Sequence, residues 1–170
     1  MKTFLLLIIF SLCMFVPSKM VLAKGLQQQI LQAKETLQVL NRQFNRYYTT
    51  HKKFPSFNGT AADFNRLGIK KVPPSTWEYF AVCNKESCQI FAERLTKIYL
   101  EKGKPAQTLL LRSTYAPKRK SSRVYAESRS VLFVNQKGNT LLVEQSSAVP
   151  EGFCTHINGQ MDANSDCVLK

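Results

Sequence analysis

This sequence of 170 residues is poor in the residues from which most active sites are built. It has two histidines, one tryptophan and 7 scattered glycines. Metal cages, charge-relay triads and phosphate-binding loops draw on these residue types at set spacings, and no H-E-x-x-H, G-x-S-x-G or glycine-rich phosphate motif is present. We therefore predict no catalytic residue, no metal site, no cofactor and no small-molecule substrate, so the protein is not expected to be an enzyme. The alternative is a secreted enzyme of unrecognised type, although no residue or motif in the sequence supports it.

Acidic residues are also scarce. Asp and Glu number 11 against 24 Lys and Arg, which gives a net charge of +13. This excess favours acidic polymers and surfaces over cationic ligands as partners. A hydrophobic content of 44% with 21% charged residues fits one folded domain better than a disordered chain or a bundle of membrane helices.

The first 23 residues have the pattern of a secretory signal peptide. Lys2 supplies a positive start, residues 4–16 are almost entirely apolar, and the segment ends on the small residue Ala23. The apolar run is shorter than the roughly 20 residues that a spanning helix needs. We therefore expect cleavage between Ala23 and Lys24, and a protein exported to the periplasm, the cell surface or the medium. Membrane contact is expected only if the segment is retained.

Removal of that segment would take away one of five cysteines and leave an even number. The remaining four are Cys83, Cys88, Cys154 and Cys167. In an exported protein they predict two disulfides. Four cysteines allow three connectivities, and the short separations favour pairing within each neighbouring couple. The spacings supply neither the paired C-x-x-C knuckles of a zinc site nor a redox C-x-x-C motif.

A helical pattern opens the rest of the chain. Its apolar residues recur in steps of three and four, at Leu26, Ile30, Ala33, Leu37, Leu40, Phe44 and Tyr47. They predict an amphipathic helix from Lys24 to near His51, because Pro55 follows soon after. We expect the stripe to pack on a sheet. A partner-binding coiled coil is the alternative, although three heptads are marginal for one.

The remaining segments predict an antiparallel sheet. Residues 52–76, with their Pro and Gly, are expected to form a loop with one helical turn. Strands are expected at residues 77–82, 89–92, 96–100, 108–112, 130–134 and 140–144, with hairpin turns at 83–88 and 135–139. A long helix followed by such strands is an α+β fold, with the helix laid across a β-meander. Residues 24–170 are expected to form a single globular domain.

The densest positive run lies in residues 116–129. Its candidates for polyanion binding are Lys118, Arg119, Lys120, Arg123 and Arg129, with Tyr115 and Tyr125 nearby for stacking. DNA is the foremost polyanion expected. A solvated loop in a chain that is basic throughout is the alternative.

The order of these features resembles that of type IV pilins and pseudopilins. The helix ends in Tyr47 and Tyr48, an aromatic–Pro step follows at Phe54 and Pro55, and residues 64–74 lead to the first strand. By this resemblance, Cys154 and Cys167 would form the disulfide that bounds the C-terminal loop of many pilins. The resemblance covers most of residues 24–170.

The N-terminus departs from the pilin pattern. Prepilins carry a Gly before the cleavage site, followed by a Phe and a Glu. Here no Gly precedes Phe4, and the first 23 residues contain no acid. If the apolar segment were retained, Phe4 would stand where the pilin Phe does, and the protein would be a membrane-held subunit.

The resemblance implies a pilin-like roll and a structural role. It predicts an exported accessory protein of a type IV pilus or a type II secretion-like system at the bacterial cell surface. Such a protein acts through surface contacts rather than catalysis, and its partners would be other pilin or secretion-system subunits. The alternative is a secreted protein that binds DNA or another polyanion through residues 116–129. The two can coexist, because pilin-like proteins with basic faces serve DNA uptake in some systems.

Overall fold

The structure is a computed structural model that describes residues 18–70, 73, 76–117, 123–136 and 139–170. The chain divides into two compact units, residues 1–31 and residues 32–170. The described residues of the first unit, from Ser18 on, are helical. No helix in the described part of the chain is long and apolar enough to cross a membrane.

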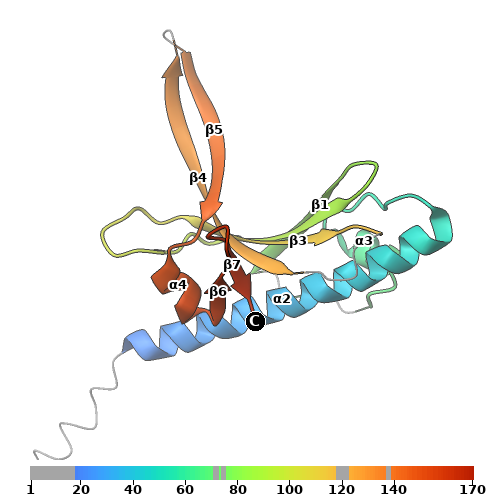
Figure 1. The fold of residues 1–170 in the computed structure, drawn as a ribbon, viewed down its shortest axis with the longest axis horizontal. Coiled ribbons are helices and arrows are strands. Elements are labelled where there is room, and N and C mark those ends of the chain that lie inside the picture. The colour runs from blue at the N-terminus through green and yellow to red at the C-terminus, as the bar shows by residue number, and fades with distance from the viewer. Residues whose placement is uncertain (1–17, 71–72, 74–75, 118–122, 137–138) are drawn as a thin grey trace, which may run out of the picture. The chain divides into compact units, whose positions relative to one another are not determined.

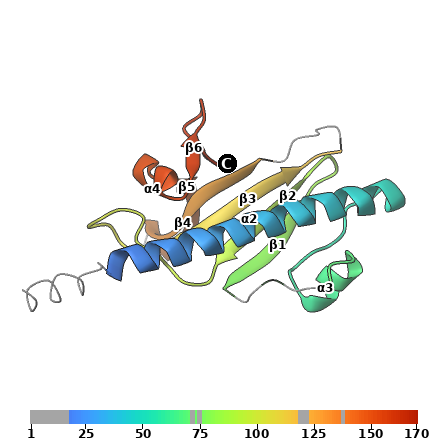
Figure 2. The ribbon, with the colours of Figure 1, turned by 90° about the horizontal axis from the view of Figure 1, so that it is seen from below.

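One long helix, α2 (Ser18–His51), begins the described chain. In the second unit its residues Ala33, Leu37, Leu40 and Phe44 are completely buried, which confirms the predicted apolar stripe. This part of α2 lies along one face of the sheet (Figures 1 and 2). The predicted end near His51 is also confirmed. Lys52 follows with a left-handed backbone, φ 55°, and donates its N–H to the Tyr48 carbonyl, which is a common way to end a helix.

The connector after α2 contains one short helix, α3 (Ala61–Arg66), as predicted. A reciprocal cap starts it: the Asp63 N–H donates to the Thr60 hydroxyl, and the Thr60 N–H donates to the Asp63 carboxylate. This places Phe64 in the core, where it meets Phe57 edge to face at 5.2 Å.

An antiparallel sheet makes up most of the second unit. Its strands are β1 (Trp77–Cys83), β2 (Cys88–Arg94), β3 (Thr108–Tyr115), β4 (Val124–Gln136), β5 (Asn139–Ala148), β6 (Gly159–Met161) and β7 (Cys167–Leu169). The strand order is β1-β2-β3-β4-β7-β6, and β5 pairs with β4. The fold is therefore α+β, with one long N-terminal helix and an antiparallel sheet of seven strands.

The strand predicted at residues 96–100 is wrong. This segment has a single bridge, between Ile98 and Gln107, and Tyr99 is 75% exposed. The chain turns back on itself at Gly103, whose φ is 81°. Ile98 therefore closes its own loop between β2 and β3 instead of joining the sheet.

Strand β4 is shared among three neighbours. Along one edge it pairs with β3, from Val124 to Arg129. Along the other edge it pairs with β7 at Tyr125 and Ala126, and with β5 from Glu127 onward. Beyond Arg129 the two strands β4 and β5 continue alone and rise from the sheet on the side away from α2 (Figure 1). The strands predicted at 130–134 and 140–144 lie in this hairpin. Of its predicted turn, residues 137 and 138 lie outside the described residues.

Both predicted disulfides are present with local pairing. Cys83 bonds to Cys88, and Cys154 bonds to Cys167. The segment closed by the second bond, expected as a loop, contains the end of α4 (Glu151–His156) and the short strand β6, and the short strand β7 begins at Cys167 itself. These elements were not predicted, because three-residue strands are too short to show a periodicity.

Candidate functional site

Three chain segments meet at one end of the second unit. Here α2 finishes, β1 turns into β2, and β3 continues toward β4. The sheet register sets Cys88 beside Tyr115, so the β1–β2 turn and the end of β3 lie together. The Tyr115 hydroxyl donates to the Asn45 side chain on α2 at 2.9 Å, which brings the last turns of the helix to the same place.

Among the described residues, exposed cations from three segments lie at this end, which we call the basic end: Lys52, Lys53, Lys85 and Arg123. Glu86, also exposed, is the acid in the β1–β2 turn. Lys52 and Lys53 directly follow α2, where the partial negative charge of a helix C-terminus favours cations. An excess of cations therefore gathers here from three separate parts of the chain.

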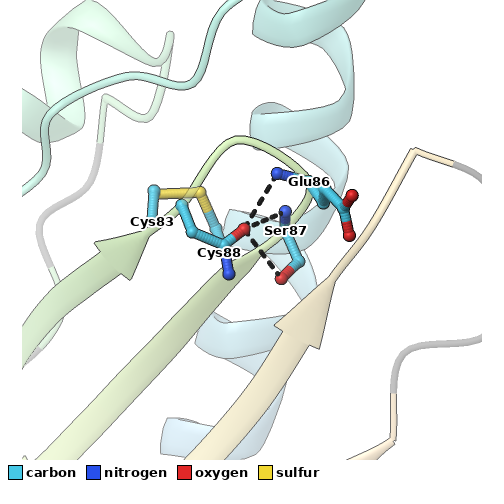
Figure 3. The surroundings of a disulfide bond; sticks show 5 residues. Cys83, Glu86, Ser87 and Cys88 are labelled. Atoms are coloured by element: carbon cyan, nitrogen blue, oxygen red, sulfur yellow. Dashed lines mark hydrogen bonds between the residues drawn. A yellow bond between two sulfur atoms is a disulfide. The ribbon is translucent and has the colours of Figure 1, made fainter.

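The β1–β2 turn holds Lys85 in a fixed loop. The Asn84 side-chain oxygen accepts hydrogen bonds from the N–H groups of Glu86 and Ser87, each at 2.8 Å. Figure 3 shows these bonds beside the Cys83–Cys88 disulfide, which closes the base of the turn. The loop has few ways to move, because it is bonded at its base and across its width.

Aromatic side chains support the helix end. Tyr48 packs on Phe54 with ring centroids 4.8 Å apart, and Phe54 meets Tyr115 edge to face at 6.0 Å. Burial raises the pKa of the Tyr115 hydroxyl, and the nearby Tyr48 raises it further. Tyr115 therefore stays neutral and keeps its hydrogen bond to Asn45 over the physiological pH range.

A shallow hollow of about 490 Å³ lies between these segments. Tyr48 lines one side, Lys85 and Ser87 another, and Ala116 and Pro117 a third. The predicted cations Lys118, Arg119 and Lys120 follow Pro117 directly, but they lie outside the described residues. Pro117 and Arg123, the described residues on either side of them, both lie at the basic end.

Two predicted site residues are already engaged by other side chains. Arg129 is six residues along β4 from Arg123, roughly 20 Å at the rise of a strand. There it forms an ion pair with Glu93 at 2.8 Å. Tyr125 has the Arg112 guanidinium over its ring at 4.9 Å, so one of its faces is already taken. The structure therefore unites Arg123 with Lys52, Lys53 and Lys85 and leaves Arg129 apart. Tyr125 lies two residues from Arg123 but has one ring face covered by Arg112. Tyr115, the other residue expected to stack, is buried at 7% exposure.

The outer sheet face, opposite α2, is stabilised by pairs that cross its strands. Phe80 stacks on Phe91 at 4.9 Å, and Arg112, which pairs with Glu127, stacks on Tyr125. These planar side chains cover one another, so the covered sides of their rings are not open to stack on a nucleic-acid base. The aromatic residues on the outer side of the sheet are therefore accounted for by cross-strand pairs that stabilise the sheet.

The described part of the chain offers no cluster of potential metal ligands. It contains no group of three or more His, Cys, Asp or Glu placed to hold a metal ion. His51 is exposed at the end of α2 and stacks on Tyr47, and His156 ends α4. Ala23 and Lys24, at the predicted cleavage site, lie within α2, and cleavage stays a prediction.

The sequence interpretation missed Lys52, Lys53 and Lys85. Each is visible in the sequence as a cation. However, both the Lys52–Lys53 pair and Lys85 lie more than 30 positions before residue 116, so only the fold shows that they share the basic end with Arg123. Comparison of the chain with known proteins found no matching family model, curated protein or solved structure.

Proposed function

We propose that the protein is an exported, pilin-like accessory subunit of a type IV pilus or a type II secretion-like system. It acts through surface contacts rather than catalysis, and its partners are other pilin or secretion-system subunits. One observation carries the proposal. The long N-terminal helix presents an apolar stripe to an antiparallel sheet, and a C-terminal segment bounded by a disulfide joins the same sheet.

Two further features support export. Both disulfides are of the kind that persists in an oxidising compartment such as the periplasm or the cell surface. The first 23 residues have the composition of a signal peptide. The finer description of the fold as a pilin-like roll belongs to this proposal.

Intact mass and N-terminal sequencing of protein from the native host test the export step. A start at Lys24 is expected, with a mass that rises by about four hydrogens on reduction. A start near Phe4 would mean a membrane-held subunit, and free thiols would contradict export.

Gene deletion tests the assembly role. Loss of pilus assembly, adhesion or secretion is expected, with rescue by the wild-type gene. Unchanged values for all three would remove the pilin-like proposal.

Polyanion binding is a second candidate function, and the basic end favours it. The exposed cations Lys52, Lys53, Lys85 and Arg123 lie at the same end of the sheet as Pro117, which directly precedes Lys118, Arg119 and Lys120 in the sequence. Counterion release would drive binding of duplex DNA, so affinity should fall as salt rises, with a slope of about 0.9 per phosphate contact.

Two triple variants with equal charge loss test this candidate. The first removes Lys52, Lys53 and Lys85 as Ala, and the second removes Lys97, Lys102 and Lys104. The control lysines are exposed and lie in the β2–β3 loop at the opposite end of the sheet. Fluorescence anisotropy with a labelled duplex should show the salt slope falling by about 2 to 3 in the first variant and much less in the second. Equal losses would show that net charge alone attracts the DNA.

A further inference from the structure

The β2–β3 loop, residues 95–107, exposes two large apolar side chains to water. Among the described residues four such side chains are exposed, and two of them, Leu95 at 54% and Tyr99 at 75%, lie in this loop. A single exposed apolar residue needs no explanation, because much of any protein surface is apolar. Two of them within five residues indicate a surface that another molecule covers.

The loop holds Tyr99 outward through its own contacts. On one side of it, Ile98 exchanges two backbone hydrogen bonds with Gln107, each at 2.8 Å. On the other side, Leu100 is buried at 9% exposure. Both neighbours of Tyr99 are therefore anchored, and its exposure belongs to an ordered loop.

Exposed lysines accompany these two side chains. Lys97, Lys102 and Lys104 are exposed, and Glu101 is the acid among residues 95–107. Three lysines against one acid give the loop a net charge of +2. A lysine also has an apolar stem, which can lie along an apolar surface while its ammonium group stays in water.

This combination of side chains fits the surface of an anionic lipid bilayer. Tyrosine is enriched at the headgroup level of membranes, where its ring is apolar and its hydroxyl is in water. An aliphatic side chain such as Leu95 adds apolar contact at the acyl boundary, and anionic headgroups attract the lysines. Nucleic acid would bind the lysines and stack on Tyr99, but it offers no partner to Leu95. The core of a protein interface is depleted of lysine.

The place of the loop in the second unit also favours a membrane contact. Asn41 of α2 bonds to Ser113 of β3. Asn45, further along α2, bonds to Tyr115, further along β3, so the two elements run in the same direction. The loop, which precedes β3, therefore lies at the end where the chain enters the second unit, opposite the β1–β2 turn (Figure 1). A preceding segment held in a membrane would draw this end toward the lipid.

We propose that the β2–β3 loop is a peripheral membrane contact that binds the surface of an anionic phospholipid bilayer. Leu95 and Tyr99 enter the headgroup region, and the three lysines bind the lipid phosphates. The contact needs no membrane-spanning helix, so it operates whether residues 1–23 are removed or retained. It goes beyond the proposed function and depends on neither candidate.

Co-sedimentation of the full chain with lipid vesicles tests the electrostatic part. Vesicles with about one-third phosphatidylglycerol should bind it more tightly than vesicles of phosphatidylcholine alone, and less tightly as salt rises. Changing Lys97, Lys102 and Lys104 to Ala should weaken binding by about fivefold per lysine, roughly 100-fold in all. The matched control changes Lys52, Lys53 and Lys85 to Ala, loses the same charge at the basic end and should weaken binding by less than about tenfold. Every variant keeps the same N-terminal residues, so these contribute equally.

A variant of unchanged charge tests the apolar part. Leu95→Ser/Tyr99→Ser should weaken binding to the anionic vesicles roughly tenfold, because it removes the side chains that enter the headgroup region. Val82→Ser is the control, since Val82 is 61% exposed on β1 near the basic end. Circular dichroism of each variant checks that it is folded.

Fluorescence gives a readout of position. Tyr99→Trp should shift its emission to the blue on vesicles and be quenched by brominated acyl chains, whereas Val82→Trp should show neither effect. The native Trp77 is 6% exposed and gives a constant background. Equal losses in the two lysine variants, or an unquenched indole at position 99, overturn the proposal. A loop variant that weakens binding of duplex DNA but not of vesicles overturns it in favour of nucleic acid.

Discussion

Asn41 on α2 donates its side-chain amide to the hydroxyl of Ser113 on β3. Asn41 is 5% exposed and Ser113 is completely buried, so this polar pair lies inside the helix–sheet interface. One turn further on, Asn45 accepts from Tyr115, two residues along the same strand. These two hydrogen bonds, one helical turn apart on α2 and two residues apart on β3, fix the position of α2 along β3.

Loss of one member of this pair should cost more than loss of both. Asn41→Ala leaves the buried Ser113 hydroxyl without its partner, which should lower the free energy of unfolding by about 1–3 kcal/mol. Asn41→Leu with Ser113→Ala replaces both groups by apolar ones and should lie within about 1 kcal/mol of wild type. Urea unfolding measures both. A double variant less stable than Asn41→Ala would contradict this account.

Gly59→Ala should destabilise the fold far more than Gly68→Ala. Both glycines have a left-handed backbone, with φ 74° and 75°. A Cβ at Gly59 would stand 2.0 Å from the Tyr79 carbonyl oxygen, whereas nothing lies within 4 Å of one at Gly68. We expect a loss of about 1 kcal/mol at Gly68 from strain alone, and about 2–4 kcal/mol at Gly59, where β1 must shift. Equal losses would mean that the connector moves away at little cost.

The contribution of Asp63 should disappear in acid. Burial raises the pKa of its carboxyl, but hydrogen bonds from the Asn58 and Thr60 amides and the Thr60 hydroxyl, with the charge of Arg66, outweigh this and hold the pKa below its usual value. A lowered pKa in the folded state means stabilisation that is full above about pH 4 and is lost as the pH falls further.

Asp63→Ala should therefore lower stability by about 1 kcal/mol at pH 7. The gap to wild type should close as the pH falls toward about 2. Thermal unfolding across this range measures it. A gap that keeps its size in acid would show that the charge of Asp63 contributes nothing to the cap.

The two disulfides should contribute unequally. Cys154→Ala/Cys167→Ala opens the longer loop, with a sequence separation of 13, and should cost about 3 kcal/mol. Cys83→Ala/Cys88→Ala opens a separation of 5 and should cost about 2 kcal/mol, because less chain entropy is released. Denaturant unfolding of both double variants gives the order. A reversed order would show that the β1–β2 turn depends on its disulfide for more than loop closure.

Features set by local pattern were predictable from sequence. The steps of three and four place Leu37, Leu40 and Phe44 on one buried face, whatever that face packs against. The runs around Cys83 and Cys88 predict a hairpin, because the chain between them is too short for any other connection. The burial of Asn41 was not predicted. Asn41 is a polar residue beside the apolar stripe of α2, and the sequence does not show that its hydrogen-bond partner, the Ser113 hydroxyl, lies opposite it on β3.

The candidate site was predictable only in part. Residues 116–129 are visibly basic in the sequence, and Arg123 lies at the basic end. Strand register decides that Arg129 pairs with Glu93 and that Arg112 covers Tyr125. The register cannot be read from the composition of the segment. Register likewise decides that residues 96–100 close a loop rather than add a strand.

The sequence by itself determined the long amphipathic helix, the hairpins, the disulfide pairing favoured by short loops and the positive charge, because each depends on neighbours within a few residues. Only the tertiary structure decided how β4 is divided among β3, β5 and β7, and that division leaves β4 and β5 paired with each other alone beyond Arg129 among the described strands. It also brought Lys52, Lys53 and Lys85 to the end where Pro117 and Arg123 lie. These arrangements join segments far apart in the chain, and packing, not local preference, selects among them.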